Sequence, residues 1–218
     1  MNLALIILIA ITALISWKGF SDIIFFDKYK FQVGAIQQRK EYIRLISAGF
    51  LHGDIMHLVF NMLTLYFFGP LVIGTFGLVG FLIIYIGSIV LGNLFSLYIY
   101  KNQSYYSAIG ASGGVSGVLF AAIAIYPHIG IGFMFIPIPI PGYIFGVLYF
   151  GYSVYMMLNP KQWDNFGHAA HLGGAAFGLV YAIIFQTQAA IGNIQYLAIM
   201  SLPLLYMGYQ IFVKKRIG

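Results

Sequence analysis

The sequence predicts an all-α protein, a polytopic membrane helical bundle, and three observations support this fold class. The chain has 218 residues, of which 61% are hydrophobic and only 7% are charged, and its mean hydropathy is +0.91. A soluble domain of this length could not bury so much apolar surface. The eleven Lys and Arg and the five Asp and Glu lie outside or at the edges of long apolar segments. These segments are expected to be helices, because unpaired backbone is too costly in lipid.

Seven apolar segments are about as long as a helix needs to cross roughly 30 Å of hydrocarbon. They cover residues 3–17, 55–76, 78–100, 108–126, 143–158, 168–185 and 194–213. We expect a single domain over residues 1–218, with a six-helix core over about residues 1–186 and one additional C-terminal transmembrane helix at about 194–213. The first segment is short, like a signal peptide. No Lys or Arg precedes it and no small-residue cleavage site follows it, so we expect a retained helix.

The connections between the segments are short, with one exception. Residues 18–54 carry six of the Lys and Arg, and the apolar spacing of residues 35–51 is compatible with a short helix in the membrane interface, its basic face toward lipid headgroups. Residues 127–142 hold Pro137, Pro139 and Pro141 on alternate positions, which forbids a helix and predicts an extended segment. The chain contains no cysteine, which excludes disulfides, thiolate metal sites and a cysteine nucleophile.

Four polar residues lie near the starts of the second, fourth and sixth segments. His57 and Asn61 occupy the first turns of the second segment, Ser112 those of the fourth and His171 that of the sixth. Because consecutive spans alternate in direction, these starts lie on one side of the membrane, and the four side chains share one depth. His57 and Asn61 are four residues apart and project from one stripe of their helix. Polar side chains at membrane depth are usually functional.

These residue types fit acyl transfer. A serine hydroxyl becomes a good nucleophile when a neighbouring base takes its proton, and a histidine suits that task. Ser112 and His171 are the candidates for these two roles. His57, the Asn61 amide and the Ser112 backbone N–H are candidate donors to an oxyanion, each worth roughly 3 kcal/mol in known hydrolases.

Two further features bear on such a pair. The fourth and sixth helices must approach closely for Ser112 to reach His171, and small residues four apart on each helix permit this. These residues are Gly113, Gly117, Gly174 and Gly178. An acidic third member is not apparent, because Asp164 lies seven residues before His171 in the expected loop, and Asp54 is typical of a helix start. The sequence therefore predicts a Ser112–His171 dyad.

Five short motifs follow one another along roughly residues 41–178. They are Phe50-Leu51-His52, His57-Leu58-Val59-Phe60-Asn61, Gly69-Pro70, Gly110-Ala111-Ser112-Gly113 and Ala170-His171-Leu172-Gly173-Gly174. Together they resemble the rhomboid intramembrane serine proteases. The resemblance implies a serine endopeptidase that cleaves transmembrane segments of other membrane proteins through a Ser112–His171 dyad, with His57 and Asn61 at the oxyanion hole. It implies no metal, nucleotide or other cofactor, no nucleic-acid partner, and a lipid bilayer as the environment, which we expect to be the cell membrane.

The sequence departs from the family pattern at two places. Members often carry a glutamate a few residues after the Gly-Pro pair, where this chain has Ile73 or Gly74, so that anchor for the first loop is missing. Many members carry an aromatic residue one turn after the nucleophile, able to pack on the histidine. Ser116 stands there in this chain, and we expect a less firmly held base. Arg44 falls where the family often has an arginine in the first loop.

Other interpretations stay open. Ser116 also lies in a GxSG sequence and is a second candidate nucleophile, one turn deeper. His168 is expected at the helix entrance facing water, and His52 is expected to cap or pack in the loop. A metal site built from histidines has no carboxylate or cysteine to complete it, and no HExxH sequence occurs. A catalytically inactive relative that binds membrane proteins is the alternative function. A small transporter is the last alternative, and it would need a continuous row of polar side chains through the bundle.

Charge and family resemblance disagree about orientation. Alternation places all eleven Lys and Arg on the side of the long loop and the candidate site. The positive-inside tendency then predicts that this face is cytoplasmic, whereas the resemblance implies the opposite arrangement in bacteria. The orientation and the oligomeric state stay open.

Overall fold

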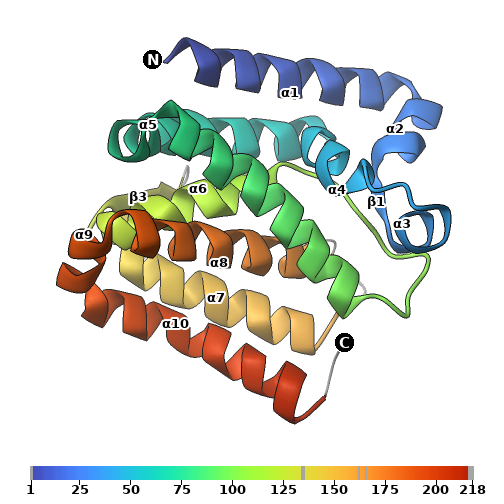
Figure 1. The fold of residues 1–218 in the computed structure, drawn as a ribbon. Coiled ribbons are helices and arrows are strands. Elements are labelled where there is room, and N and C mark those ends of the chain that lie inside the picture. The colour runs from blue at the N-terminus through green and yellow to red at the C-terminus, as the bar shows by residue number, and fades with distance from the viewer. Residues whose placement is uncertain (1, 134–135, 162, 165, 216–218) are drawn as a thin grey trace.

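The protein is an all-α membrane bundle, as predicted (Figure 1). The computed structural model describes residues 2–133, 136–161, 163–164 and 166–215. Its helices are α1 (Leu3–Ser21), α2 (Ile23–Tyr29), α3 (Val33–Arg39), α4 (Arg44–Ser47), η1 (Ala48–Phe50), α5 (Ile55–Ile99), α6 (Ser112–Ile125), α7 (Gly142–Leu158), α8 (His168–Phe185), α9 (Thr187–Gly192), α10 (Ile194–Gly208) and the π-helical turn η2 (Tyr209–Val213). Its strands are β1 (Phe31–Gln32), β2 (Ser107–Ala108), β3 (Gly130–Phe133) and β4 (Ile136–Pro141).

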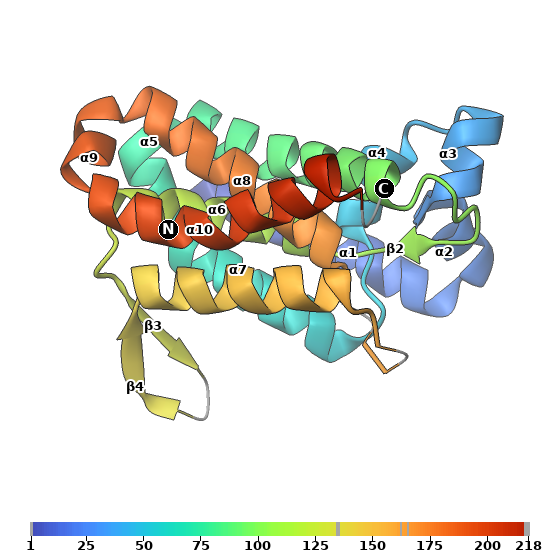
Figure 2. The same ribbon diagram turned by 90° about the horizontal axis from the view of Figure 1, so that it is seen from below.

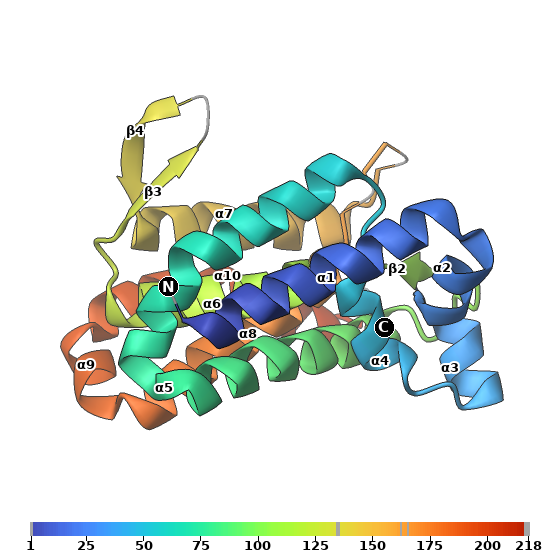
Figure 3. The ribbon, with the colours of Figure 1, turned by 90° about the horizontal axis from the view of Figure 1, so that it is seen from above.

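Helix α5 contains two of the expected spans. It is interrupted at Gly77, which has φ 73° and ψ 172°, a conformation that glycine adopts without a steric penalty. The chain reverses near this residue, and the second arm of α5 runs back at an angle to the first (Figures 1 and 3). A single glycine therefore replaces a loop between the second and third apolar segments.

Within the described residues, four helices are long and apolar enough to cross a membrane. They are α1, α5, α8 and the helix of residues Ile194–Val213. Helices α6 and α7 are apolar but shorter, at 14 and 17 residues. All residues of α6 from Gly113 to Ala124 are buried, so this helix is surrounded by protein. Helix α1 lies at one edge of the bundle and α10 at the opposite edge (Figure 1).

The two helices that carry Ser112 and His171 touch through backbone, as the glycine spacing predicts. A Cβ atom added at Gly174 would overlap the backbone of Gly113, and one added at Gly178 would overlap the backbone of Gly117. Helix α8 also packs tightly on the second arm of α5, because a Cβ at Gly92 would overlap the Ala170 carbonyl oxygen. Small-residue contacts of this kind let membrane helices approach closely.

The prediction of one interfacial helix over residues 35–51 is wrong. Helix α3 ends at Arg39, the following residue Lys40 has a left-handed φ of 62°, and α4 begins only at Arg44. Arg44 does not face headgroups but is 4% exposed. Its Nη1 donates to the carbonyl oxygens of Asp27 and Lys30 at 2.7 Å, and its Nε donates to Glu41 at 2.5 Å. Each donor of a buried guanidinium needs a hydrogen-bond partner, so Arg44 holds the surrounding segments of the loop together.

Other contacts anchor the same loop, although this chain has no glutamate near Ile73 to do so. Asn93, on the second arm of α5, donates its amide to the Leu45 carbonyl oxygen at 2.8 Å. Strand β1 pairs antiparallel with β2, which aligns Phe31 with Ala108. The long loop is thus joined directly to the segment that leads into α6.

Residues Gly130–Phe133 and Ile136–Pro141 of the connection at residues 127–142 are extended, as the alternating prolines predict. Strands β3 and β4 pair antiparallel as a hairpin, which the sequence analysis did not foresee. The hairpin projects from the end of the bundle opposite to the start of α6 (Figures 2 and 3). It therefore lies far from Ser112.

Candidate active site

Ser112 and His171 meet at one end of the bundle. Ser112 is the first residue of α6, and His171 lies in the first turn of α8. The His171 Nε2 and Ser112 Oγ atoms are 2.5 Å apart. Both residues are half-buried. The serine hydroxyl and an imidazole nitrogen therefore lie within hydrogen-bonding distance, the arrangement that a nucleophile and its general base need.

The turn before Ser112 depends on Gly110. Gly110 has φ 116° and donates its N–H to the Ala48 carbonyl oxygen at 3.0 Å. A Cβ at this position would lie 2.7 Å from two atoms of the His57 ring and 3.5 Å from Ser112 Oγ. Both the backbone angle and the space therefore require glycine. The same contact shows that the His57 imidazole lies against this turn, beside the serine hydroxyl.

The start of α5 positions His57 and Asn61. Asp54 caps this helix, accepting the His57 N–H at 2.8 Å, as its sequence position predicts. Asn61 is 6% exposed, and its amide donates to the His57 carbonyl oxygen at 3.2 Å. The structure thus brings His57 to the Ser112 turn, whereas the Asn61 amide is engaged within its own helix.

His52 has a larger part in the site than the sequence suggested. It is fully buried. The Ser16 hydroxyl donates to the Phe50 carbonyl oxygen at 2.9 Å, so Ser16 Oγ accepts the proton of His52 Nδ1 at 2.8 Å. His52 Nε2 is then free to accept the backbone N–H of Ala111 at 3.3 Å. Helix α1 is connected by this chain of hydrogen bonds to the residue before Ser112.

The chain of hydrogen bonds through His52 requires a neutral imidazole. Burial and, to a smaller extent, the neighbouring His57 lower the pKa of His52 to about 3, while Asp54 opposes the shift. The His52 and His57 ring centroids are 4.9 Å apart, in an edge-to-face arrangement. A charged His52 could not accept the Ala111 N–H, so the burial and the hydrogen bonds favour the same protonation state.

His168 begins α8, as expected, but its expected exposure to water is wrong. His168 does not face water but is 5% exposed, and its Nε2 lies 2.8 Å from an Asp164 carboxylate oxygen. Asp164 lies in the loop before α8, as expected, but its carboxylate pairs with His168 rather than with His171. The His168 and His171 ring centroids are 6.4 Å apart. The acidic residue nearest in sequence therefore belongs to a neighbouring pair.

The expected loose packing of His171 is also wrong. An aromatic ring does lie on it, but it comes from α7. The Tyr149 ring is nearly parallel to that of His171, with an interplanar angle of 20° and centroids 6.3 Å apart. The Tyr149 hydroxyl lies 2.8 Å from Ser116 Oγ. Ser116, the second candidate nucleophile, is therefore paired with a tyrosine. The two residues are 33 positions apart in the sequence, so local spacing does not reveal this contact.

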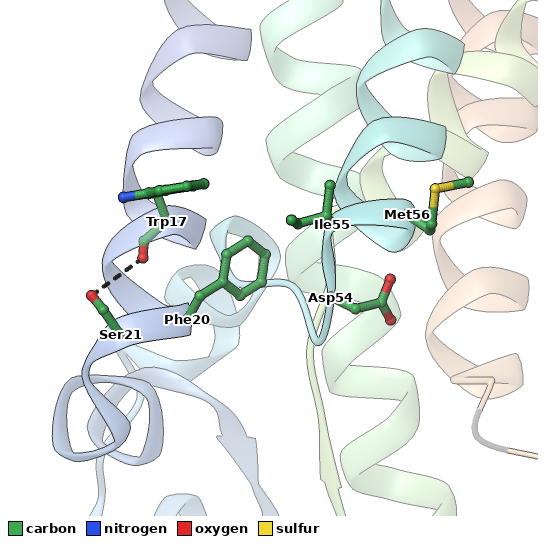
Figure 4. Close-up of a pocket in the computed structure, with 6 residues that line it drawn as sticks. All are labelled: Trp17, Phe20, Ser21, Asp54, Ile55 and Met56. Carbon is green, nitrogen blue, oxygen red and sulfur yellow. Dashed lines mark hydrogen bonds between the residues drawn. The ribbon is translucent and has the colours of Figure 1, made fainter.

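Two cavities lie at this end of the protein. The smaller, of about 10 Å³, adjoins Ser112, Gly110 and Asn93 and is close to the minimum that one water molecule needs. The larger, of about 570 Å³, lies between the end of α1 and the start of α5 and is shown in Figure 4. It is lined by Trp17, Phe20, Ser21, Asp54, Ile55 and Met56. The Asp54 carboxylate already caps α5, so this larger pocket lacks the convergent polar groups of a reaction site.

Within the described part of the chain, no group of three or more His, Cys, Asp or Glu residues could hold a metal ion. The site consists of a serine, a histidine that contacts it, a second histidine beside the turn that precedes the serine, and the N–H groups of the first turn of α6, which have no acceptor within that helix. Such a set can transfer a proton and bind a developing oxyanion.

Comparison with known proteins places this site in a family. Rhomboid protein 1, mitochondrial, of Saccharomyces cerevisiae is 31% identical over 147 residues, covering 64% of this chain and 40% of the yeast protein. RHOMBOID-like protein 12, mitochondrial, of Arabidopsis thaliana is 26% identical over 181 residues, covering 76% and 53%. Presenilin-associated rhomboid-like protein, mitochondrial, of Homo sapiens is 30% identical over 141 residues, covering 63% and 36%.

The matched stretches make up about half or less of these relatives. The Rhomboid domain family matches residues 39–188, which is more than half of the chain and includes Ser112, His171, His57 and Asn61. The chain therefore belongs to the rhomboid family.

Proposed function

We propose that this protein is an intramembrane serine endopeptidase that cleaves transmembrane segments of other membrane proteins. The observation that carries the proposal is the 2.5 Å contact between Ser112 Oγ and His171 Nε2 at the mouth of α6 and α8. Ser112 is the nucleophile and His171 the general base. The yeast, plant and human relatives are named as rhomboid or rhomboid-like proteins, which supports the same activity.

The reaction follows from this contact. His171 Nε2 takes the hydroxyl proton as Ser112 Oγ attacks the peptide carbonyl carbon, and an oxyanion forms. The proton passes from His171 to the departing amine, the C–N bond breaks, and an acyl-enzyme remains. A water molecule then gives a proton to His171 and attacks the ester, which releases the carboxylic acid and returns the proton to Ser112. The small cavity beside Ser112 has room for such a water.

The oxyanion is held by donors on two helices. The backbone N–H groups of Ser112 and Gly113 lie in the first turn of α6, where they have no partner inside the helix. The His57 ring lies on the same side of the nucleophile turn, and we assign it to the oxyanion site. Asn61 joins them when its amide rotates away from the His57 carbonyl oxygen. Each donor contributes several kcal/mol to transition-state binding in known hydrolases.

The substrates follow from where the site lies. The protein is a multi-pass membrane protein, and the dyad lies at the ends of buried apolar helices, so a peptide bond reaches it from within or near the bilayer. The expected cell-membrane location is not supported by the relatives, whose names are mitochondrial. Fractionation of cells that express the chain at native level distinguishes the two membranes.

The test is cleavage of a generic transmembrane substrate by purified protein, comparing wild type with Ser112→Ala, His171→Ala and Ser116→Ala. We expect the first two variants to lose at least roughly 1,000-fold in rate, because the nucleophile and its base act as a unit. Ser116→Ala is the matched control and stays within about ten-fold of wild type.

Two results would contradict the proposal. Cleavage that is indifferent to Ser112 would remove the assigned nucleophile. Failure of folded wild type to cleave several substrates with small residues and helix breakers would favour the alternative, a catalytically inactive rhomboid-like protein that binds membrane proteins.

A further inference from the structure

Tyr149 touches both helices of the dyad from a third helix. Its ring lies nearly parallel to the His171 imidazole, 6.3 Å away between centroids, and its hydroxyl lies 2.8 Å from Ser116 Oγ. Ser116 lies one helical turn after Ser112 on α6 and is 5% exposed. One side chain from α7 thus spans from the helix of the nucleophile to the ring of the base.

The Tyr149 ring is itself held in place. It packs against Phe120 on α6, with centroids 5.3 Å apart, and against Phe145 on its own helix at 5.6 Å. The hydrogen bond with Ser116 fixes the far end of the ring. A buried ring with packed faces and a bonded hydroxyl has little freedom to rotate, because core side chains sit at crystal-like density.

We infer that Tyr149, anchored through Ser116, is a positioning residue for His171, holding the imidazole plane so that Nε2 points at Ser112 Oγ. The inference rests on the proposed protease function. Among the residues that the structure describes, no carboxylate bonds to His171 to orient its ring, because the nearby Asp164 pairs with His168. The packed tyrosine supplies the orientation that a hydrogen-bonded acid provides in a catalytic triad.

Orientation is a larger effect here than direct stabilisation of the imidazolium. A ring face attracts a cation strongly within about 6 Å of its centroid, and 6.3 Å between the two centroids lies just beyond that range. A small misplacement of a reacting group, by contrast, costs up to about 100-fold in rate.

The experiment measures kcat and KM for a transmembrane substrate, together with the labelling rate of Ser112 by a small fluorophosphonate. Labelling reports the activated serine without substrate recognition. We expect Tyr149→Leu to lower kcat and labelling by about 10- to 100-fold with little change in KM. Tyr149→Phe and Ser116→Ala each lower both by roughly 2- to 10-fold, the range of one neutral hydrogen bond. The double variant is no slower than either single variant, because both remove the same bond.

The matched control is Tyr155→Leu, the same change on the same helix at a side chain that is 57% exposed. It leaves kcat and labelling unchanged. If Tyr149→Leu does not fold, as judged by thermal unfolding in detergent, the Tyr149→Phe and Ser116→Ala pair decides alone. Folded variants with wild-type labelling, or additive losses in the double variant, would overturn the inference. Wild type that is not labelled at Ser112 would instead overturn the proposed function.

Discussion

Helices α6 and α8 meet through glycine backbone, whereas α7 and the loop of residues 18–54 reach the same site through long side chains. At Gly174 and Gly178 an added methyl group would overlap the facing backbone, but at Gly151 on α7 it would meet nothing within 4 Å. Helix α7 instead contributes the Tyr149 ring, and the loop contributes the ring of His52, while the guanidinium of Arg44 holds the loop itself together. The distance between Ser112 and His171 is thus set by backbone, and their surroundings are set by side chains.

The largest effect is expected where backbone meets backbone. Gly174→Ala should lower the free energy of unfolding by about 3 kcal/mol, since the new methyl group forces the two helices apart. Gly151→Ala is the matched control and should raise it by roughly 0.5 kcal/mol, because alanine is the better helix former. Chemical unfolding in detergent micelles measures both. Equal effects of the two variants would contradict the comparison.

The second test concerns the loop, where one side chain carries several contacts. Arg44→Gln should cost about 2 kcal/mol, because the carbonyl oxygens of Asp27 and Lys30 and the Glu41 carboxylate lose a buried charged donor. Arg39 also contacts Glu41 but is exposed, and Arg39→Gln should change the unfolding free energy by less than about 0.5 kcal/mol. Similar losses from both variants in the same unfolding assay would show that burial of Arg44 is not what matters.

The third test concerns the pH dependence of stability. The pKa of His52 falls from 6.5 to about 3 on folding, mainly through burial, so between these values the unfolded chain binds the additional proton. The contribution of neutral His52 to the free energy of unfolding is therefore fully present above pH 6.5. It declines as the pH falls toward 3, by at most about 1.4 kcal/mol per pH unit. His52→Gln should flatten the decline between pH 7 and pH 5, measured as the difference in unfolding free energy from wild type. Parallel curves would show that His52 is not the group responsible.

The sequence predicted the backbone part of this arrangement better than the side-chain part. Span alternation placed Ser112 and His171 at one end, and the glycine spacing predicted the close approach of their helices, because both are periodic signals along the chain. The catalytic roles of these residues stay predictions. The stacking of Tyr149 on His171 and the buried state of Arg44 and His168 were missed. They depend on distances between elements that no local spacing records.

The absence of a residue that is common in the family did not predict the absence of the contact that this residue makes. The lack of an aromatic residue at Ser116 predicted a loose base, yet a tyrosine from α7 occupies the space and bonds to that serine. The lack of a glutamate near Ile73 removes one anchor of the first loop, yet Asn93 and the β1–β2 pair hold this loop. In both cases the contact was recovered from a residue far away in sequence, which a motif comparison does not inspect.

The reversal at Gly77 has a consequence for how the protein enters the bilayer. The two arms of α5 are joined by one residue in an otherwise helical run from Ile55 to Ile99, so no hydrophilic loop has to be carried across between them. The backbone groups of each arm are satisfied within its own helix, so the two arms can enter the bilayer together as one helical hairpin. Insertion in this way would deliver the arm that holds Asn61 and the arm that holds Asn93 in a single event.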